Sequence, residues 1–252
     1  RITVPFWREA DVEEPVDFVE EIARIQGYTA IPIEPIRGAI PLARRDSLFA
    51  WERDTKILLK DMGWTEVMNY SLVSGATLGK AGYDLSSAIK INNPLSSEFE
   101  YLRTRLLPGI CESLAENEQK KDVVRLFELG KIYIPRSLTD LPDERFSLVG
   151  AIMRKGSTEE LFREAKGVLE RLSRLWFASS DALTFRPAVQ AQYAKDKQTA
   201  DVYLGEELVG FVGPAKRTLL QAFDIKTPTV LFHVDFEKIL PLMTKAITFI
   251  PL

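Results

Sequence analysis

Acidic side chains near the start of the chain have the types and the spacing that best suit chemistry. Asp17, Glu20 and Glu21 stand at positions i, i+3 and i+4, which places them on one face of a helix, and Asp11 lies six residues before Asp17. Carboxylate oxygens are the ligands that Mg²⁺ prefers in proteins. The spacing predicts a magnesium site; the alternative is an acidic first turn that the helix dipole stabilises and water solvates.

The sequence contains one histidine and one cysteine, which limits the remaining chemistry. A single histidine cannot build a multi-histidine metal centre. His233 lies in the run LFHVDF and is predicted to be a hydrogen-bonded residue of a buried strand, and Cys111 a buried apolar residue of a helix. Arg103 and Arg105 suit phosphates or a partner carboxylate, but arginines in such positions more often form structural ion pairs.

Composition limits the class of protein. The 252 residues are 46% hydrophobic and 27% charged, which is typical of one large globular domain, or of a small domain beside a larger one, and excludes disordered and collagen-like chains. The net charge of -3 argues against binding of nucleic acid that is mainly electrostatic, although it is compatible with a local basic patch. One cysteine favours a reducing compartment, so we expect a cytoplasmic protein, and no apolar run approaches the roughly 18 residues of a membrane span.

The acidic residues belong to a helix that is predicted over residues 15–26. Pro15 suits its first turn, and Gly27 suits the left-handed conformation that ends it. The prolines of the following segment, 31–43, interrupt regular structure and predict a linker. We therefore expect a domain boundary near residue 40, which separates residues 1–40 from residues 41–252.

A second long helix is predicted from Ser47 to Met62. Trp51, Leu58 and Met62 are spaced to form one apolar stripe along it. The stripe is a candidate surface for contact with a partner. The alternative is that it covers the sheet of its own domain, as amphipathic helices usually do.

The rest of the chain alternates between runs that favour strands and runs that favour helices. Helices are predicted at 108–119, 159–176 and 214–222, and strands at 67–73, 123–134, 146–153, 200–204, 208–212 and 229–236. The strands follow one another mostly through short, hairpin-like connections. The order predicts an α+β fold with a largely antiparallel sheet flanked by helices and preceded by part of a small α/β domain.

Several stretches together resemble one known family. The stretch VPFWREADVEEPVDFVEEIARIQGYTAIP at 4–32 is similar to the end of the B-five-type domain of the phenylalanyl-tRNA synthetase β subunit. Five further stretches resemble, in the same order, the next module of that subunit: GWTEVMNYSLV at 63–73, NPLSSEFEYLRTRLLPGI at 93–110, RLFELGKIY at 125–133, AKGVLERL at 165–172 and ELVGFVGP at 207–214. The shared order covers nearly the whole chain.

The resemblance implies a class II synthetase-like module that supports ATP-dependent charging of tRNA(Phe) with phenylalanine by a separate catalytic α subunit, within an (αβ)₂ heterotetramer. ATP is then used by the complex and is not expected to bind this chain. The family's editing and anticodon-binding domains are not represented in the matched stretches. The chain starts at Arg1 without a methionine and stops in an apolar run, so we interpret it as a fragment of the β subunit.

The resemblance also implies site residues. In the family a Mg²⁺ site shared with the α subunit falls on acidic positions that match Asp11, Asp17, Glu20 and Glu21. The helix that corresponds to 47–62 packs against the α subunit in the family, which makes Trp51, Leu58 and Met62 partner-interface candidates.

The sequence departs from catalytic class II enzymes at two positions. Those enzymes place one arginine at the end of the motif-two strand and a second in a glycine-rich motif-three helix; here Ile134 and Pro135 follow RLFELGKIY, and no Gly-x-Gly-x-Gly run ending in arginine occurs near 230–245. Without fixed cations an adenylation site loses about 3 kcal/mol of transition-state stabilisation per missing contact. We therefore expect a chain that is not catalytic by itself.

Two alternatives stay open at this point. The first is a synthetase-like regulatory paralogue that acts as an interaction module and binds another partner. The second is a true ligase that positions phosphates with arginines elsewhere in the chain, such as Arg136, Arg154 or Arg217. Lys120 and Lys121 end a predicted helix, where positive charge is favourable anyway, so a tRNA contact there is the minor interpretation.

Overall fold

A computed structural model describes residues 2–39, 47–136, 140–188, 193–195 and 197–244. The chain divides into two compact units, Arg1–Arg44 and Arg45–Leu252. The predicted boundary between residues 40 and 41 lies outside the described residues. No helix in the described part of the chain combines the length and the apolar character that crossing a membrane requires.

The first unit is built around helix α1 (Pro15–Gln26). Pro15 occupies the first turn, and Gly27 ends the helix with a φ of 85°, as its sequence predicts. Short 3₁₀ turns at Phe6–Arg8 and Tyr28–Ala30 flank the helix. Val12 is the only buried hydrophobic residue among those described in this unit, and the side chains of Ile22 and Ile25 on α1 are exposed.

The second unit contains one large sheet. Among the described residues, seven strands form it in the order β1-β4-β5-β9-β8-β7-β6. Only the pairing of β1 with β4 is parallel; every other neighbouring pair is antiparallel, which confirms the predicted α+β class. The strands are β1 (Thr65–Glu66), β4 (Val123–Ile134), β5 (Asp143–Arg154), β6 (Leu183–Pro187), β7 (Ala200–Leu204), β8 (Glu207–Pro214) and β9 (Thr229–Asp235).

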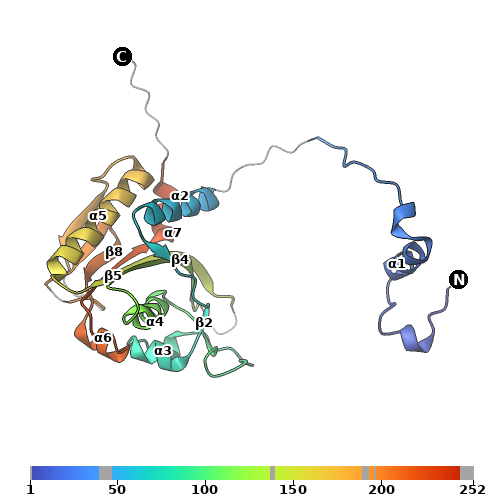
Figure 1. The fold of residues 1–252 in the computed structure, drawn as a ribbon, viewed down its shortest axis with the longest axis horizontal. Coiled ribbons are helices and arrows are strands. Elements are labelled where there is room, and N and C mark those ends of the chain that lie inside the picture. Colours follow the sequence, from blue (N-terminus) through green and yellow to red (C-terminus); the bar gives the residue numbers. More distant parts are fainter. Residues whose placement is uncertain (1, 40–46, 137–139, 189–192, 196, 245–252) are drawn as a thin grey trace, which may run out of the picture. The chain divides into compact units, whose positions relative to one another are not determined.

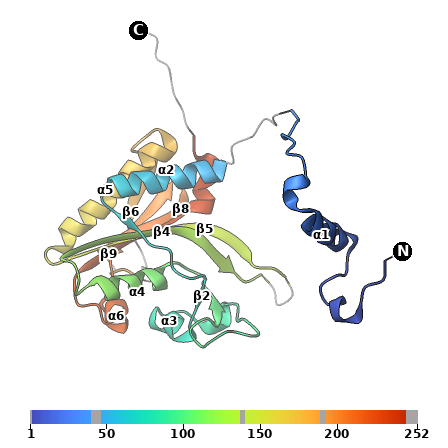
Figure 2. The same cartoon turned by 45° about the vertical axis from the view of Figure 1, so that its right-hand side comes forward.

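Helices cover both faces of this sheet (Figures 1 and 2). One face carries α2 (Ser47–Asp61), α5 (Thr158–Phe177) and α7 (Phe236–Ile239), and the other carries α3 (Gly75–Lys80), α4 (Leu107–Asn117) and α6 (Arg217–Ala222). Alternate residues of one strand therefore enter different cores: Phe232 packs toward α5, whereas Leu231 packs toward α4. Burial on both faces explains the nearly continuous apolar runs of the central strands.

The strand predicted over 67–73 is present only in its last two residues. Strand β1 ends at Glu66, before this range, and β2 (Leu72–Val73) pairs with β3 (Tyr101–Leu102) in a separate small sheet. Between β1 and β2, the backbone carbonyl of Asn69 accepts a hydrogen bond from Arg103 Nη1 at 3.0 Å. This contact ties the segment between β1 and β2 to a residue far along the chain.

Candidate functional site

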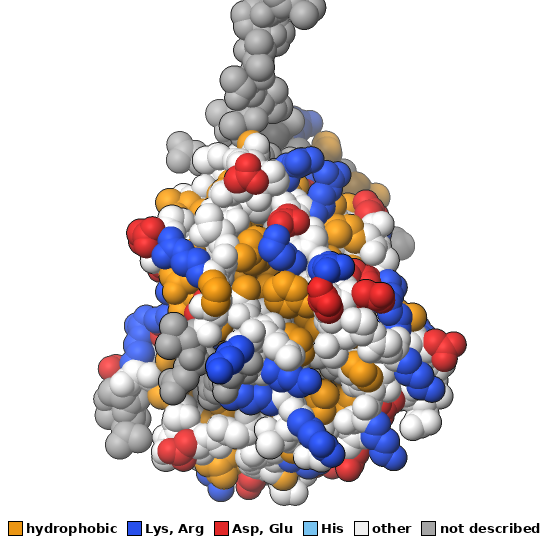
Figure 3. Space-filling view, turned by 90° about the vertical axis from the view of Figure 1, so that its left-hand side faces the viewer, with side chains coloured by type: hydrophobic (Ala, Val, Ile, Leu, Met, Phe, Trp, Pro, Cys, Tyr) orange, Lys and Arg blue, Asp and Glu red, His pale blue; other side chains and the backbone are white. Residues whose placement is uncertain are grey.

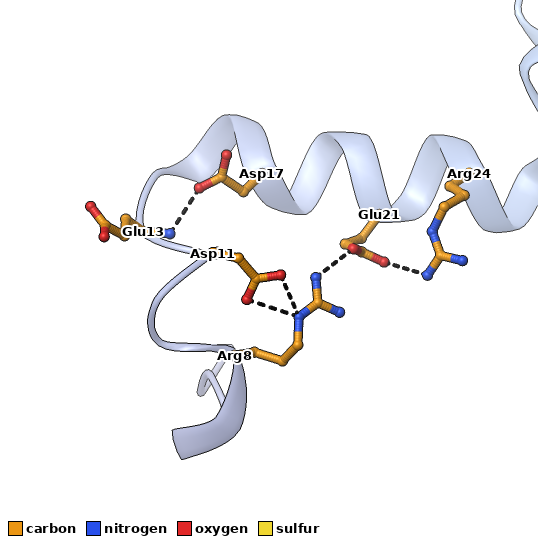
Figure 4. Close-up of polar contacts among 6 residues, drawn as sticks. All are labelled: Arg8, Asp11, Glu13, Asp17, Glu21 and Arg24. Carbon is orange, nitrogen blue, oxygen red and sulfur yellow. Dashed lines mark hydrogen bonds and ion pairs between the residues drawn. The ribbon is translucent and has the colours of Figure 1, made fainter.

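Asp17, the central acid of the predicted metal site, caps its own helix. Its Oδ2 accepts hydrogen bonds from the backbone N–H groups of Glu13 at 2.8 Å and Glu14 at 2.7 Å (Figure 4). The Glu14 side chain accepts in turn from the backbone N–H of Asp17, which completes a reciprocal capping box. Backbone amides therefore already use an oxygen of Asp17 that a metal ion would need.

Arg8 joins two other members of the predicted site. Its Nε donates to both oxygens of Asp11, at 3.0 and 2.8 Å, and its Nη2 donates to Glu21 Oε1 at 2.7 Å (Figure 4). Arg24 Nη2 donates to the other oxygen of Glu21 at 2.6 Å. The hydrogen bonds from Arg8 and Arg24 lower the pKa of Glu21 to about 2. Asp11 and Glu21 are thus brought together around a guanidinium group.

The four predicted ligands do not form a metal-ligand set in this arrangement. Asp11 and Glu21 face arginines, Asp17 faces backbone amides, and Glu20 is exposed on α1. Across the described ranges, no group of three or more His, Cys, Asp or Glu side chains has the arrangement that a metal ion needs. Asp17 lies in the first turn of α1, where its carboxylate caps backbone amides. Magnesium binding by these residues stays a prediction.

The apolar stripe of α2 packs on the core of its own unit. Trp51 is 6% exposed and belongs to the core beneath α5, and Leu58 and Met62 are partly buried against the same core. Trp51 is therefore a core residue and not a free interface residue. The opposite side of α2 carries Phe49 and Ile57, which are 71% and 44% exposed. The sequence analysis missed these two positions; their signal is an eight-residue spacing, which places both on one helical face.

Arg103 forms the structural ion pair that its position favours. Its Nη1 lies 2.5 Å from Glu128 Oε1, and both side chains are almost fully buried. Its Nε donates to the backbone carbonyl of Lys131 at 2.9 Å, and Asn69 Nδ2 donates to Glu128 Oε2 at 2.8 Å. The guanidinium is buried and its Nε and Nη1 are bound to its own fold, so it is not available as a phosphate ligand.

The α4 face of the sheet holds a cleft of about 310 Å³. The register places Asp201 of β7 beside Phe211 of β8, and Phe211 beside His233 of β9, and these three residues line the cleft together with Arg105 and Asp235. Within the described lining, Arg105 is the one cationic side chain, and Asp201 and Asp235 are the two carboxylates. A nucleoside triphosphate needs several fixed cations, so this cleft is poorly suited to one.

His233 is a hydrogen-bonded strand residue, as its sequence context predicts, but it is only partly buried because it lines the cleft. Its Nε2 lies 3.0 Å from Ser147 Oγ. Burial, with a smaller contribution from the nearby Arg105, lowers the pKa of His233 to about 4. The imidazole is therefore neutral at pH 7. Cys111 is buried, and burial raises the pKa of its thiol to about 12, which makes it an unreactive core residue.

The depressed pKa of His233 predicts a loss of stability in mild acid. In the unfolded chain His233 takes up a proton near pH 6.5, whereas in the folded chain it does so only near pH 4. The contribution of this residue to the free energy of unfolding is therefore fully present above pH 6.5 and is lost as the pH decreases toward 4. Between pH 7.5 and pH 4.5 the loss in the free energy of unfolding is roughly 2–3 kcal/mol. Urea denaturation at pH 7.5 and pH 4.5 measures the change, and the His233→Gln variant should show a clearly smaller one. An equal change in both proteins would contradict this assignment.

Comparison with known proteins gives two family matches. Residues 31–236 match the model of the phenylalanyl tRNA synthetase beta chain CLM domain, and residues 1–28 match the tRNA synthetase B5 domain. Phenylalanine–tRNA ligase beta subunits are similar as well: that of Dehalococcoides mccartyi is 32% identical over 93% of this chain, and that of Syntrophus aciditrophicus is 30% identical over 99%. The chain spans 30% and 32% of the lengths of these two relatives.

Solved structures show the same fold. Two structures of a pyrrolysyl-tRNA synthetase from Desulfitobacterium hafniense superpose with TM-scores of 0.60 and 0.64 at 20% and 15% sequence identity. The first match covers 82% of this chain and 75% of the other, and the second covers 99% and 88%. At these identities the likeness concerns the fold alone, which is that of a class II synthetase.

Proposed function

Because this chain belongs to the phenylalanyl-tRNA synthetase β-chain family, we propose that it is the non-catalytic, synthetase-like part of a phenylalanine–tRNA ligase β subunit. In this role it holds the catalytic α subunit, within an (αβ)₂ assembly, while the complex charges tRNA(Phe) with phenylalanine at the expense of ATP. The observation that carries the proposal is the family match over residues 31–236, which includes the whole large sheet.

The charge of the cleft supports a role without catalysis. Forming an adenylate builds negative charge that fixed cations must stabilise, and the described lining offers Arg105 against Asp201 and Asp235. The arginines that would restore a ligase site are engaged elsewhere: Arg136 pairs with Asp143 at 2.9 Å, and Arg154 pairs with Glu164 at 3.5 Å. Arg217 lines a different cleft. A true ligase would require a different set of phosphate ligands.

The outer side of α2 supports the contact with the α subunit. Phe49 and Ile57 expose apolar side chains on one helical face, and Arg53, which is 56% exposed, lies between them. Exposed aromatic and aliphatic side chains beside an arginine are the composition of a protein interface. We therefore place the proposed contact on the face that carries Phe49 and Ile57, and not on the Trp51 stripe.

Mixing this chain with a phenylalanine–tRNA ligase α subunit should give a stable complex in size-exclusion chromatography with light scattering. Phe49→Glu combined with Ile57→Glu should weaken the association at least tenfold, because two charges would enter a desolvated interface. Leu141→Glu with Leu208→Glu introduces the same charges at other exposed positions, 86% and 47% exposed, and should leave the complex intact.

Three results would contradict the proposal. If the full-length β subunit binds the α subunit and this chain does not, the contact lies outside this part of the protein. If neither binds, the chain is better explained as a regulatory paralogue with another partner. ATP–pyrophosphate exchange by the isolated chain would contradict the non-catalytic role.

Magnesium shared with the α subunit, through Asp11, Asp17, Glu20 and Glu21, stays part of the proposal. It requires that Arg8 leave Asp11 and Glu21, since its guanidinium now lies 2.8 and 2.7 Å from these carboxylates. The same chromatography with and without MgCl₂ provides the measurement. Tighter association in MgCl₂ that Glu20→Ala with Glu21→Ala abolishes would support a shared ion, and an unchanged complex would contradict it.

A further inference from the structure

Six exposed cationic side chains gather at one end of the large sheet. The register brings the start of β4, the end of β5, the start of β9 and the end of β8 to this end, since Val123 pairs with Arg154, Met153 with Thr229, and Val230 with Pro214. The chain segments next to these strand ends each contribute to the set, here called the basic end: Lys120, Lys121, Lys155, Lys195, Arg217 and Lys226.

The basic end is hollowed by two adjoining clefts. The first, of about 230 Å³, is lined by Lys120, Lys121 and Lys155, and the second, of about 410 Å³, by Lys195, Arg217 and Lys226. The segment 226–229 supplies lining residues to both clefts. Helices α5 and α6 lie on the side of the molecule that Figure 3 faces, and lysine and arginine side chains gather there in the lower half of the view.

The cations of the basic end outnumber the carboxylates that line the two clefts. With the described residues, none of the six side chains forms an ion pair, whereas the neighbouring Arg125 pairs with Glu164 at 2.6 Å. Glu118 also lines the first cleft: its Oε1 accepts from the backbone N–H groups of Lys226 at 2.8 Å and Thr227 at 2.6 Å, and its negative charge partly offsets the charge of Lys226. Asp122 is the other carboxylate in the lining.

The side chains that line the two clefts indicate which kind of polyanion fits them. Neither described lining contains an aromatic side chain on which a base could stack, so phosphate groups are the available targets. None of the large hydrophobic side chains exposed in the described ranges lies among the lining residues, and a basic surface that inserts into lipid usually carries such side chains. The features favour the phosphate backbone of a nucleic acid over an anionic membrane.

We propose that the basic end binds the phosphate backbone of a folded RNA without reading its sequence. Because the chain has a net charge of -3, the proposal depends on this local set of cations and not on the charge of the chain as a whole. The proposal does not rest on the contact with an α subunit, since this chain alone would bind the RNA. In a ligase complex, the RNA at hand would be its tRNA substrate.

Fluorescence anisotropy with a labelled tRNA transcript in 50 mM NaCl tests the proposal on the full chain. Lys155→Glu with Lys226→Glu, one residue from each cleft, should weaken binding at least tenfold. Lys60→Glu with Lys90→Glu makes the same change in net charge at positions that are 72% and 57% exposed and lie outside both clefts, and should weaken it less than threefold. Raising NaCl to 200 mM should weaken wild-type binding more than tenfold, as expected for several released counterions.

Three outcomes would overturn the proposal. The first is an equal loss in both double variants, which would show that only the net charge matters. The second is no measurable binding of tRNA by the wild-type chain in 50 mM NaCl. The third is binding to phosphatidylserine vesicles that is tighter than binding to tRNA and is lost in the same Lys155 and Lys226 variant, which would assign the basic end to a membrane surface. None of these outcomes depends on whether the α subunit binds.

Discussion

Replacing Arg103 with methionine is expected to lower the free energy of unfolding by about 3–5 kcal/mol, because it leaves a buried carboxylate without its partner. The Glu128 side chain is 4% exposed and lies 2.5 Å from Arg103 Nη1. The same guanidinium donates to the carbonyls of Asn69 at 3.0 Å and Lys131 at 2.9 Å, so these acceptors lose their donor as well. Urea denaturation at pH 7 measures the loss.

A double-mutant cycle separates the ion pair from packing. Arg103→Met combined with Glu128→Met removes both charges and keeps most of the volume, so it should be clearly more stable than the sum of the two single variants predicts. A loss below about 1 kcal/mol in Arg103→Met would show that water reaches Glu128 and that the pair is not buried in solution.

The structural consequence of losing Arg103 is local. Its backbone N–H donates to Ser71 at 2.9 Å, and its side chain holds Asn69, so this residue fixes the path between β1 and β2. Amide hydrogen exchange in residues 67–73 should therefore accelerate in Arg103→Met even under conditions where the variant stays folded.

Trp176→Ala is expected to lower the free energy of unfolding by about 3–5 kcal/mol, because it leaves a large cavity in the core. The indole of Trp176 is fully buried on α5 and packs edge to face with Phe236 at a ring distance of 5.9 Å. Its Nε1 donates to Thr55 Oγ1 of α2 at 2.8 Å. The side chain therefore joins the helix that carries the proposed α-subunit contact to the rest of the core.

Two milder variants divide the effect of Trp176. Trp176→Phe keeps an aromatic ring but leaves the buried Thr55 hydroxyl without its donor, and Thr55→Val leaves the indole N–H without its acceptor; each should cost about 1–3 kcal/mol. Chemical denaturation gives these losses. If Trp176→Ala costs no more than Thr55→Val, the ring contributes little packing and the prediction is wrong. Faster amide exchange in α2 is the expected accompanying result in Trp176→Ala.

The sequence by itself determined most of the longer helices and strands, and the family. Pro15 and Gly27 mark the two ends of α1 because their allowed backbone angles are a local property. The strand predicted at 123–134 has the same limits in the structure because a long β-favouring run carries its own signal. The motifs in their shared order predicted the β-subunit family, which the match over residues 31–236 confirms.

Only the tertiary structure decided which partner each side chain meets. The spacing of Asp11, Asp17 and Glu21 places carboxylates near one another, but it does not show that Arg8 and backbone amides occupy them. The stripe of α2 is visible in the sequence, yet the choice between core and partner depended on α5, whose Trp176 meets Thr55 across 121 positions of sequence.

The basic end shows the same limit most clearly. Its six cations come from segments spread between residues 120 and 226, and no window of the sequence contains enough of them to show a patch. Antiparallel pairing brings the ends of β4, β5, β8 and β9 together. Local propensities act over a few residues, whereas surfaces form from contacts between distant segments, so the elements are readable from the sequence and the surfaces required the fold.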